Sequence, residues 1–170
     1  QDLSSRSLYD MVSLVQQNVF VFNSTIRNNI TMFSSFSEEE VERAIRLSGL
    51  SELVAERGED YICGENGSGL SGGEKQRLSI ARSLLKKSKV LLVDEATAAL
   101  DKQTAYKIAT TFLELKDMTR IIVTHSLDEE LLKQYDCIVA LKNGTIIESG
   151  NFRDLTDKKG YFYSLYTLSQ

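Results

Sequence analysis

The sequence predicts an α/β fold in which helices pack on a parallel sheet, and three observations support this. Residues 90–93 form an apolar run without polar alternation, which is typical of a strand covered on both faces. Amphipathic helical spacing follows at residues 105–113, and the strand pattern returns at residues 120–125. Strand, helix and strand in this order predict two parallel strands joined by a crossover helix.

The amino-terminal part of the chain predicts one strand and two helices. Residues 11–17 are apolar and rich in β-branched side chains, so we expect a strand that ends near Gln17. A polar stretch at 23–29, rich in Ser and Asn, follows without an assigned element. Ser37 precedes three glutamates, which favours a helix start there, and a shorter helix is expected at 51–56.

A glycine-rich stretch precedes the next predicted helix. Ser71, followed three residues later by Glu74, forms a capping box, so we expect a helix from Ser71 to about Lys87. Gly72 and Gly73 weaken its first turn and leave backbone amides open to close approach by a ligand. Such a helix start suits a phosphate group, although a capped helix after a flexible loop explains the pattern equally well.

Candidate catalytic residues follow the predicted strands. Asp94 and Glu95 end the apolar run, where Asp94 could hold Mg²⁺ and Glu95 could polarise a water molecule. His125, the only histidine, ends the next predicted strand, and Gln17 ends the first. Because ligands bind beyond the carboxyl ends of parallel strands, we expect these residues to share one sheet edge. The alternatives are an acidic helix start and a structural histidine.

The remaining sequence predicts a hairpin between two helices. A helix is expected at 127–133 and a last one at 161–168. Strand patterns at 137–141 and 145–148 flank the Lys-Asn-Gly turn at 142–144, which is typical of a hairpin.

Composition narrows the classes of function. The net charge of −4 and scattered basic residues argue against nucleic-acid binding. No apolar run approaches the roughly 20 residues of a membrane-spanning helix. Cys63 and Cys137 lie far apart without metal-ligand spacing, so we expect reduced, intracellular thiols.

The order of the motifs resembles the nucleotide-binding domain of ATP-binding-cassette (ABC) transporters, of the exporter type. LSGGEKQR at 70–77 resembles the signature motif, and VLLVDE at 90–95 resembles the Walker B strand with its catalytic glutamate. Residues 99–101 are similar to the D-loop, and His125 to the switch histidine. Gln17, followed by VFVF, is similar to the exporter-type Q-loop.

The resemblance implies a P-loop NTPase-like parallel sheet with a helical subdomain that runs from the Q-loop to the signature helix. About 18–88 form this subdomain, while 11–17 and 89–170 belong to the α/β catalytic core. The Gly-Lys-Ser/Thr phosphate loop (Walker A) of an intact cassette is missing, because the nearest match, at 64–71, has Leu70 where Lys is required. We therefore interpret the chain as a C-terminal part of a cassette, truncated at the N-terminus.

The resemblance also implies cofactors and residue roles. ATP and Mg²⁺ are the expected cofactors, with Asp94 and Gln17 as metal contacts. Glu95, His125 and Gln17 are the expected catalytic residues. The residues expected to contact nucleotide, from the signature motif and the D-loop, are Ser71, Gly72, Gly73, Gln76 and Asp101.

The implied function is ATP hydrolysis by a dimer of cassettes, coupled to the transmembrane domain of an exporter. The expected location is the cytoplasmic face of the cell membrane, with these 170 residues soluble by themselves and no nucleic-acid partner. Without a phosphate loop, the chain alone is expected to bind ATP poorly and to be inactive.

Two alternatives remain open. A non-catalytic half cassette would donate only its signature motif, and an intact Glu95 and His125 argue against it. A soluble ABC ATPase of DNA repair or chromosome organisation would carry long coiled-coil insertions. The segment 18–69 has no heptad pattern, which argues against this class.

Overall fold

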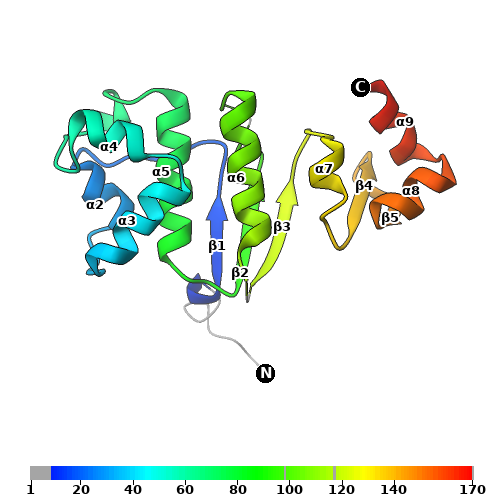
Figure 1. The fold of residues 1–170 in the computed structure, drawn as a ribbon, viewed down its shortest axis with the longest axis horizontal. Helices are drawn as coiled ribbons and strands as arrows, with labels where there is room; N and C mark the ends of the chain where they lie inside the picture. The colour runs from blue at the N-terminus through cyan, green and yellow to red at the C-terminus, as the bar shows by residue number, and fades with distance from the viewer. Residues whose placement is uncertain (1–8, 98, 117, 170) are drawn as a thin grey trace. The chain divides into compact units, whose positions relative to one another are not determined.

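The computed structural model describes residues 9–97, 99–116 and 118–169. These residues form two compact units, of which the first ends at Val123 and the second begins at Thr124. Each unit has its own strands and its own buried core (Figure 1).

The first unit contains most of the helices. The elements between residues 26 and 85 are α2 (Ile26–Thr31), α3 (Glu38–Leu47), α4 (Ser51–Arg57), the short 3₁₀ turn η1 (Glu65–Gly67) and α5 (Gly72–Leu85). Their buried side chains form one cluster, which we call the helical core; its members include Val21, Ile26, Leu50, Cys63 and Leu78.

Capping boxes start the two longest of these helices. Ser37 caps α3 by accepting a hydrogen bond from the Glu40 amide, and the Glu40 carboxylate accepts from the Ser37 amide. Ser71 and Glu74 make the same exchange at α5. The helix start predicted from the Ser71–Glu74 capping box and the one predicted from Ser37 and the three glutamates after it are therefore confirmed.

A three-stranded parallel sheet completes the first unit. Its strands are β1 (Val12–Val15), β2 (Val90–Asp94) and β3 (Thr119–Val123), in the order β1-β2-β3, with helix α6 (Lys102–Glu114) between β2 and β3 in the chain. The parallel sheet predicted from the strand–helix–strand pattern is confirmed.

The two faces of this sheet are packed differently. On the covered face, Val15 and Val93 are buried in a cluster with Ile80 of α5 and Phe112 of α6, and both helices lie along the sheet (Figure 1). On the other face, which we call the open face, Leu14 and Ile121 are 47% and 54% exposed. They flank Leu92 in register, so they point to the same side.

Two helices and three strand ends differ from the predictions, the third being β5, which ends at Gly150 instead of residue 148. The sequence assigned no element to α2 or to α8 (Phe152–Lys158). Both are short helices that begin at a capping side chain, Thr25 and Asn151. Strand β1 ends two residues earlier than predicted, and so does β3, because the residues beyond them leave the ladder.

The second unit is built around the predicted hairpin. Strands β4 (Ile138–Lys142) and β5 (Thr145–Gly150) pair antiparallel across Asn143 and Gly144, whose φ angles of 51° and 75° suit a tight hairpin turn. Helix α7 (Glu129–Leu132) precedes the hairpin, and α8 and α9 (Tyr161–Leu168) follow it.

Buried residues from α7, β4, α8 and α9 form the core of this second unit. Leu132, Ala140, Phe152, Leu155 and Phe162 are the buried members. The Glu148 carboxylate on β5 accepts a hydrogen bond from the Phe162 amide at 2.7 Å, which fastens the first turn of α9 to the hairpin. None of the helices in the described part of the chain has the length and apolar character needed to cross a bilayer.

Candidate functional site

The amino end of α5, which we call the tip, consists of Ser71, Gly72 and Gly73. Ser71 and Gly72 are exposed, and a Cβ built on Gly72 would meet no atom within 4 Å among the described residues. The Ser71 hydroxyl accepts from the Glu74 amide at 3.3 Å. The remaining first-turn amides and the helix dipole make such an end favourable for an anion.

One side of the tip lies against the segment that resembles the D-loop. A Cβ on Gly73 would be 3.4 Å from both the Ala99 carbonyl oxygen and Leu100 Cδ2. The first turn of α5 therefore packs at ordinary van der Waals distance from residues 99–100. Asp101 follows as the N-cap of α6 and accepts from the Thr104 amide at 2.9 Å. Its hydrogen bonds with Thr104 lower the pKa of the Asp101 carboxyl.

A basic side chain supports the loop that leads into the tip. Arg57 donates a hydrogen bond to the Gly69 carbonyl at 2.8 Å and lies 3.9 Å from the Glu74 carboxylate. Its guanidinium also lies over the Tyr61 ring, 5.1 Å from the centroid. Burial raises the pKa of Glu74, but hydrogen bonds from Ser71 outweigh it and leave that pKa below its ordinary value. Arg57 thus connects the loop before the tip with the first turn of α5.

Gln76, which the sequence placed among the nucleotide contacts, lies in a different environment from the tip. Its side chain is 2% exposed, and its amide Nε2 donates to the backbone carbonyl of Gln16 at 3.0 Å. Gln16 directly precedes Gln17. The structure thus connects the signature helix to the backbone beside the candidate Q-loop glutamine.

The sheet edge holds the candidate catalytic residues of the first unit. Asp94 is the exposed last residue of β2, and Glu95 follows it with a positive φ of 48°. The Glu95 amide donates to the Val123 carbonyl at 3.0 Å, which fixes its backbone at the end of β3. Gln17 is exposed in a bend two residues beyond β1. Because Val15 pairs with Val93, these residues all follow the carboxyl edge of the sheet.

His125 follows β3 by two residues in the chain and belongs to the second unit. It is exposed and lies in a bend. That it meets Asp94 and Glu95 at one edge therefore stays a prediction from the strand order.

The donor set at the sheet edge fits Mg²⁺. A carboxylate from Asp94 and an amide oxygen from Gln17 are hard oxygen ligands. No group of three or more His, Cys, Asp or Glu among the described residues could hold a metal ion. A Mg²⁺ ion commonly takes one or two protein oxygens and completes its shell with water and phosphate.

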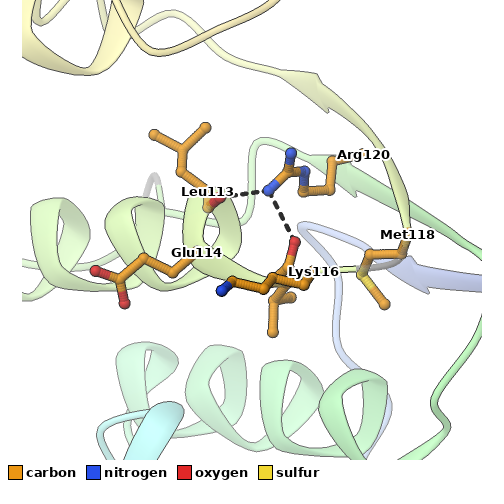
Figure 2. A pocket seen from close by; sticks show the side chains of 6 residues that line it. Leu113, Glu114, Lys116, Met118 and Arg120 are labelled. Carbon is orange, nitrogen blue, oxygen red and sulfur yellow. Dashed lines mark hydrogen bonds between the residues drawn. The ribbon is translucent and has the colours of Figure 1, made fainter.

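A pocket of about 670 Å³ lies elsewhere in the first unit. It is lined by residues 113–116, Met118 and Arg120, at the end of α6 and the start of β3 (Figure 2). Arg120 Nη1 donates to the carbonyls of Phe112, Leu113 and Leu115, so the guanidinium caps the carboxyl end of α6. The pocket lies at the opposite end of β3 from Val123, and none of the predicted site residues lines it.

A polar network around Arg82 escaped the sequence analysis. Arg82, on α5, donates to the Asn29 and Phe20 carbonyls, each at 2.6 Å, and to Asn29 Oδ1 at 2.8 Å. Asn29 is fully buried and also exchanges hydrogen bonds with the Phe22 backbone. Burial lowers the pKa of Arg82 to about 10. Its partners lie more than 50 residues away in sequence, and no local pattern indicates them.

Comparison with known proteins gives relatives along nearly the whole chain. A family model described as ABC transporter matches residues 1–98. The ATP-dependent lipid A-core flippase of Vibrio vulnificus (strain YJ016) is 37% identical over 99% of this chain, and that of Pectobacterium atrosepticum is 40% identical over 95%. The chain spans only 29% and 28% of the lengths of these two relatives.

A solved structure shows the same fold. A bacterial Atm1-family ABC exporter with ATP bound superposes with a TM-score of 0.88 and 34% identity. The match covers 96% of this chain and 29% of that chain. The match of the family model to more than half of the sequence, together with this fold, shows that the chain belongs to the ABC transporter family.

Proposed function

We propose that this chain is part of the ATP-hydrolysing domain of an ABC exporter. The observation that carries the proposal is that one chain contains both an open α5 tip and, at the carboxyl edge of a parallel sheet, Asp94 and Glu95. The relatives are named as ATP-dependent flippases and as an Atm1-family exporter, which supports an export function. We expect the transported substrate to be recognised by parts of the transporter outside the region that matches this chain.

The proposed mechanism assigns a role to each group. The Glu95 carboxylate orients and polarises the attacking water, and the His125 imidazole contacts the γ-phosphate. Asp94 and Gln17 would hold Mg²⁺, which neutralises phosphate charge when bound. The Ser71 hydroxyl and the amides of Gly72 and Gly73 contact the nucleotide held by a second cassette. Asp101 lies beside this contact and couples the nucleotide state of one ATP site to that of the other.

We also propose the division into a helical subdomain, about 18–88, and a catalytic core formed by 11–17 and 89–170. The helical core supports this division, because all of its buried members lie between Val21 and Leu85. After Gln17, three aromatic rings make edge-to-face contacts in a row. The ring centroids are 4.9 Å apart for Phe20 and Phe22 and 5.3 Å apart for Phe22 and Phe33.

The exposed rings in this aromatic row support a contact with membrane helices. Phe20 and Phe33 are 63% and 61% exposed. Exposed aromatic groups of this kind are frequent in protein interfaces. We propose that they contact the exporter's transmembrane domain at the cytoplasmic face of the membrane.

The test is Glu95→Gln in the full-length transporter, compared with Glu39→Gln, which makes the same chemical change at an exposed position of α3. We expect the Glu95 variant to hydrolyse ATP at least about 100-fold more slowly while nucleotide-bound dimers persist, because water activation is lost but phosphate contacts remain. Glu39→Gln is expected to keep normal turnover. Unchanged hydrolysis in Glu95→Gln would contradict the catalytic role.

A third variant separates the proposal from the half-cassette alternative. Gly72→Arg places a bulky charge where the structure has open space, so the fold should tolerate it. A chain that only donates its signature motif predicts loss of hydrolysis in Gly72→Arg and none in Glu95→Gln. Our proposal predicts loss in both variants.

A further inference from the structure

The contact between Gln76 and Gln16 joins two segments that lie 60 residues apart in sequence. Gln76 is buried on α5, less than two turns from the Ser71 tip, whereas Gln16 and Gln17 are exposed beyond the end of β1. The donor is the side-chain amide and the acceptor is a backbone carbonyl. This contact therefore acts on the course of the main chain rather than on the Gln16 side chain.

Holding the Gln16 carbonyl also restrains Gln17. The peptide unit is planar, so the direction of the Gln16 carbonyl sets the direction of the Gln17 amide. The position of the Gln17 Cα atom, and with it the range that the Gln17 side chain can reach, is thereby restricted. An exposed bend without this bond would be free to sample other backbone conformations.

A second anchor on the same helix lies close by. Arg82 donates to the carbonyl of Phe20 at 2.6 Å and to that of Asn29 at 2.6 Å. The backbone is thus held by α5 at Gln16 and again at Phe20, and residues 17–19 span the distance between these anchors. A three-residue segment that is held at both ends loses much of its conformational freedom.

We infer that Gln76 is a positioning residue for Gln17: its amide holds the Gln16 carbonyl so that Gln17 is presented at the nucleotide and Mg²⁺ site. This inference rests on the function proposed above. It replaces a direct contact of Gln76 with nucleotide, which burial of the side chain disfavours. A change at Gln76 should then act only through Gln17.

The experiment is a double-mutant cycle of Gln76→Met and Gln17→Ala in the full-length transporter, read as ATPase rate against Mg²⁺ concentration. Methionine keeps the length and apolar volume of the side chain but cannot donate a hydrogen bond. Ser83→Ala is the matched control, because Ser83 is also buried on α5 but donates within the helix, to the Ser79 carbonyl at 3.2 Å.

We expect Gln76→Met to lower kcat by about three- to tenfold, the size of one lost hydrogen bond between neutral groups, and to raise the Mg²⁺ concentration for half-maximal activity. The KM for ATP should change less than kcat. Gln76→Glu keeps the size of the side chain but removes the donor that faces the carbonyl, so it should reproduce the shift. Ser83→Ala should leave the Mg²⁺ dependence unchanged.

The cycle decides between positioning and general loosening of α5. In the Gln17→Ala background, Gln76→Met should have no further effect, whereas a purely structural role would lower activity by the same factor again. Equal effects in both backgrounds, or a normal Mg²⁺ dependence in both Gln76 variants, would overturn the inference. So would a Gln17→Ala variant with normal activity. Glu95 stays unchanged in every variant of this cycle, so failure of the inference would leave the Glu95→Gln test of the proposed function unaffected.

Discussion

The helical core and the parallel sheet of the first unit differ in how their apolar side chains are covered. In the helical core, Leu50 and Leu78 are fully buried among neighbours that come from the same stretch of chain. In the sheet, Val15 and Val93 are buried on one face, but Leu14 and Ile121 remain about half exposed on the other. Parallel sheets normally have both faces covered.

This difference separates the two parts of the proposed site. The Ser71 tip begins a helix that is anchored in a closed core, so its geometry depends on residues of this chain. Asp94 and Glu95 lie at the end of β2, in a sheet whose open face we expect to be covered when the protein is assembled. The helix that we propose to contact phosphate thus depends less on further partners for its packing than the sheet edge that we propose to carry the catalytic groups.

The largest effect expected from this comparison concerns nucleotide affinity. The open tip can offer only a few amides and a hydroxyl, and the 170 residues contain no Gly-Lys-Ser/Thr loop. Isothermal titration of the isolated chain with MgATP should therefore give a Kd weaker than about 1 mM, corresponding to a binding free energy of no more than about 4 kcal/mol. Micromolar affinity would show that the sheet edge binds nucleotide without further partners.

A pair of truncations compares the stability of the two regions. Leu78→Ala empties a fully buried position of the helical core and should reduce the free energy of unfolding by about 2–5 kcal/mol. Ile121→Ala removes a half-exposed side chain on the open face and should cost less than about 1 kcal/mol. Urea denaturation of both variants provides the measurement. Similar losses would mean that the open face is buried in solution, for example by self-association.

Thiol labelling gives the smallest expected effect and tests whether the helical core is closed. Cys63 is fully buried in that core and burial raises the pKa of its thiol, so little thiolate is available to react. Cys137 is exposed. With iodoacetamide at pH 8, Cys63 should react at least about tenfold more slowly than Cys137, until urea removes the difference. Equal rates, measured by mass spectrometry of peptides, would indicate that the core opens readily.

Local sequence signals predicted the parts of the fold that local physics controls. Ser37 with the three glutamates after it placed the start of α3, and the Ser71–Glu74 spacing placed the start of α5. The apolar run at 90–93 placed β2, because caps and buried strands leave patterns within a few residues. Helix α2 escaped because the contacts that hold it are distant. Its buried Asn29 bonds to Arg82, 53 residues further along the chain.

The residues of the candidate site also fall into those that the sequence indicates and those that it does not. The tip residues and the acids after β2 could be read from motifs and strand order. The buried position of Gln76 could not, because its partner is a backbone carbonyl, which carries no residue-specific signal in sequence. The end of β1, by contrast, agrees with the sequence, because the apolar residues and the strand pairing both stop at Val15, and the predicted extension to Gln17 included two polar residues.

The partners of Arg82 determine how the segment after Gln17 responds to the solution around it. Surface ion pairs such as Arg27 with Glu38 weaken as added ions screen their charges. The oxygens that Arg82 contacts belong to two backbone carbonyls and one side-chain amide, none of which carries a net charge or titrates. With a pKa of about 10, the guanidinium stays protonated at neutral pH. The hold of Arg82 on the Phe20 and Asn29 carbonyls should therefore change little with ionic strength, whereas the Arg27–Glu38 pair, whose arginine lies in the same segment, should weaken.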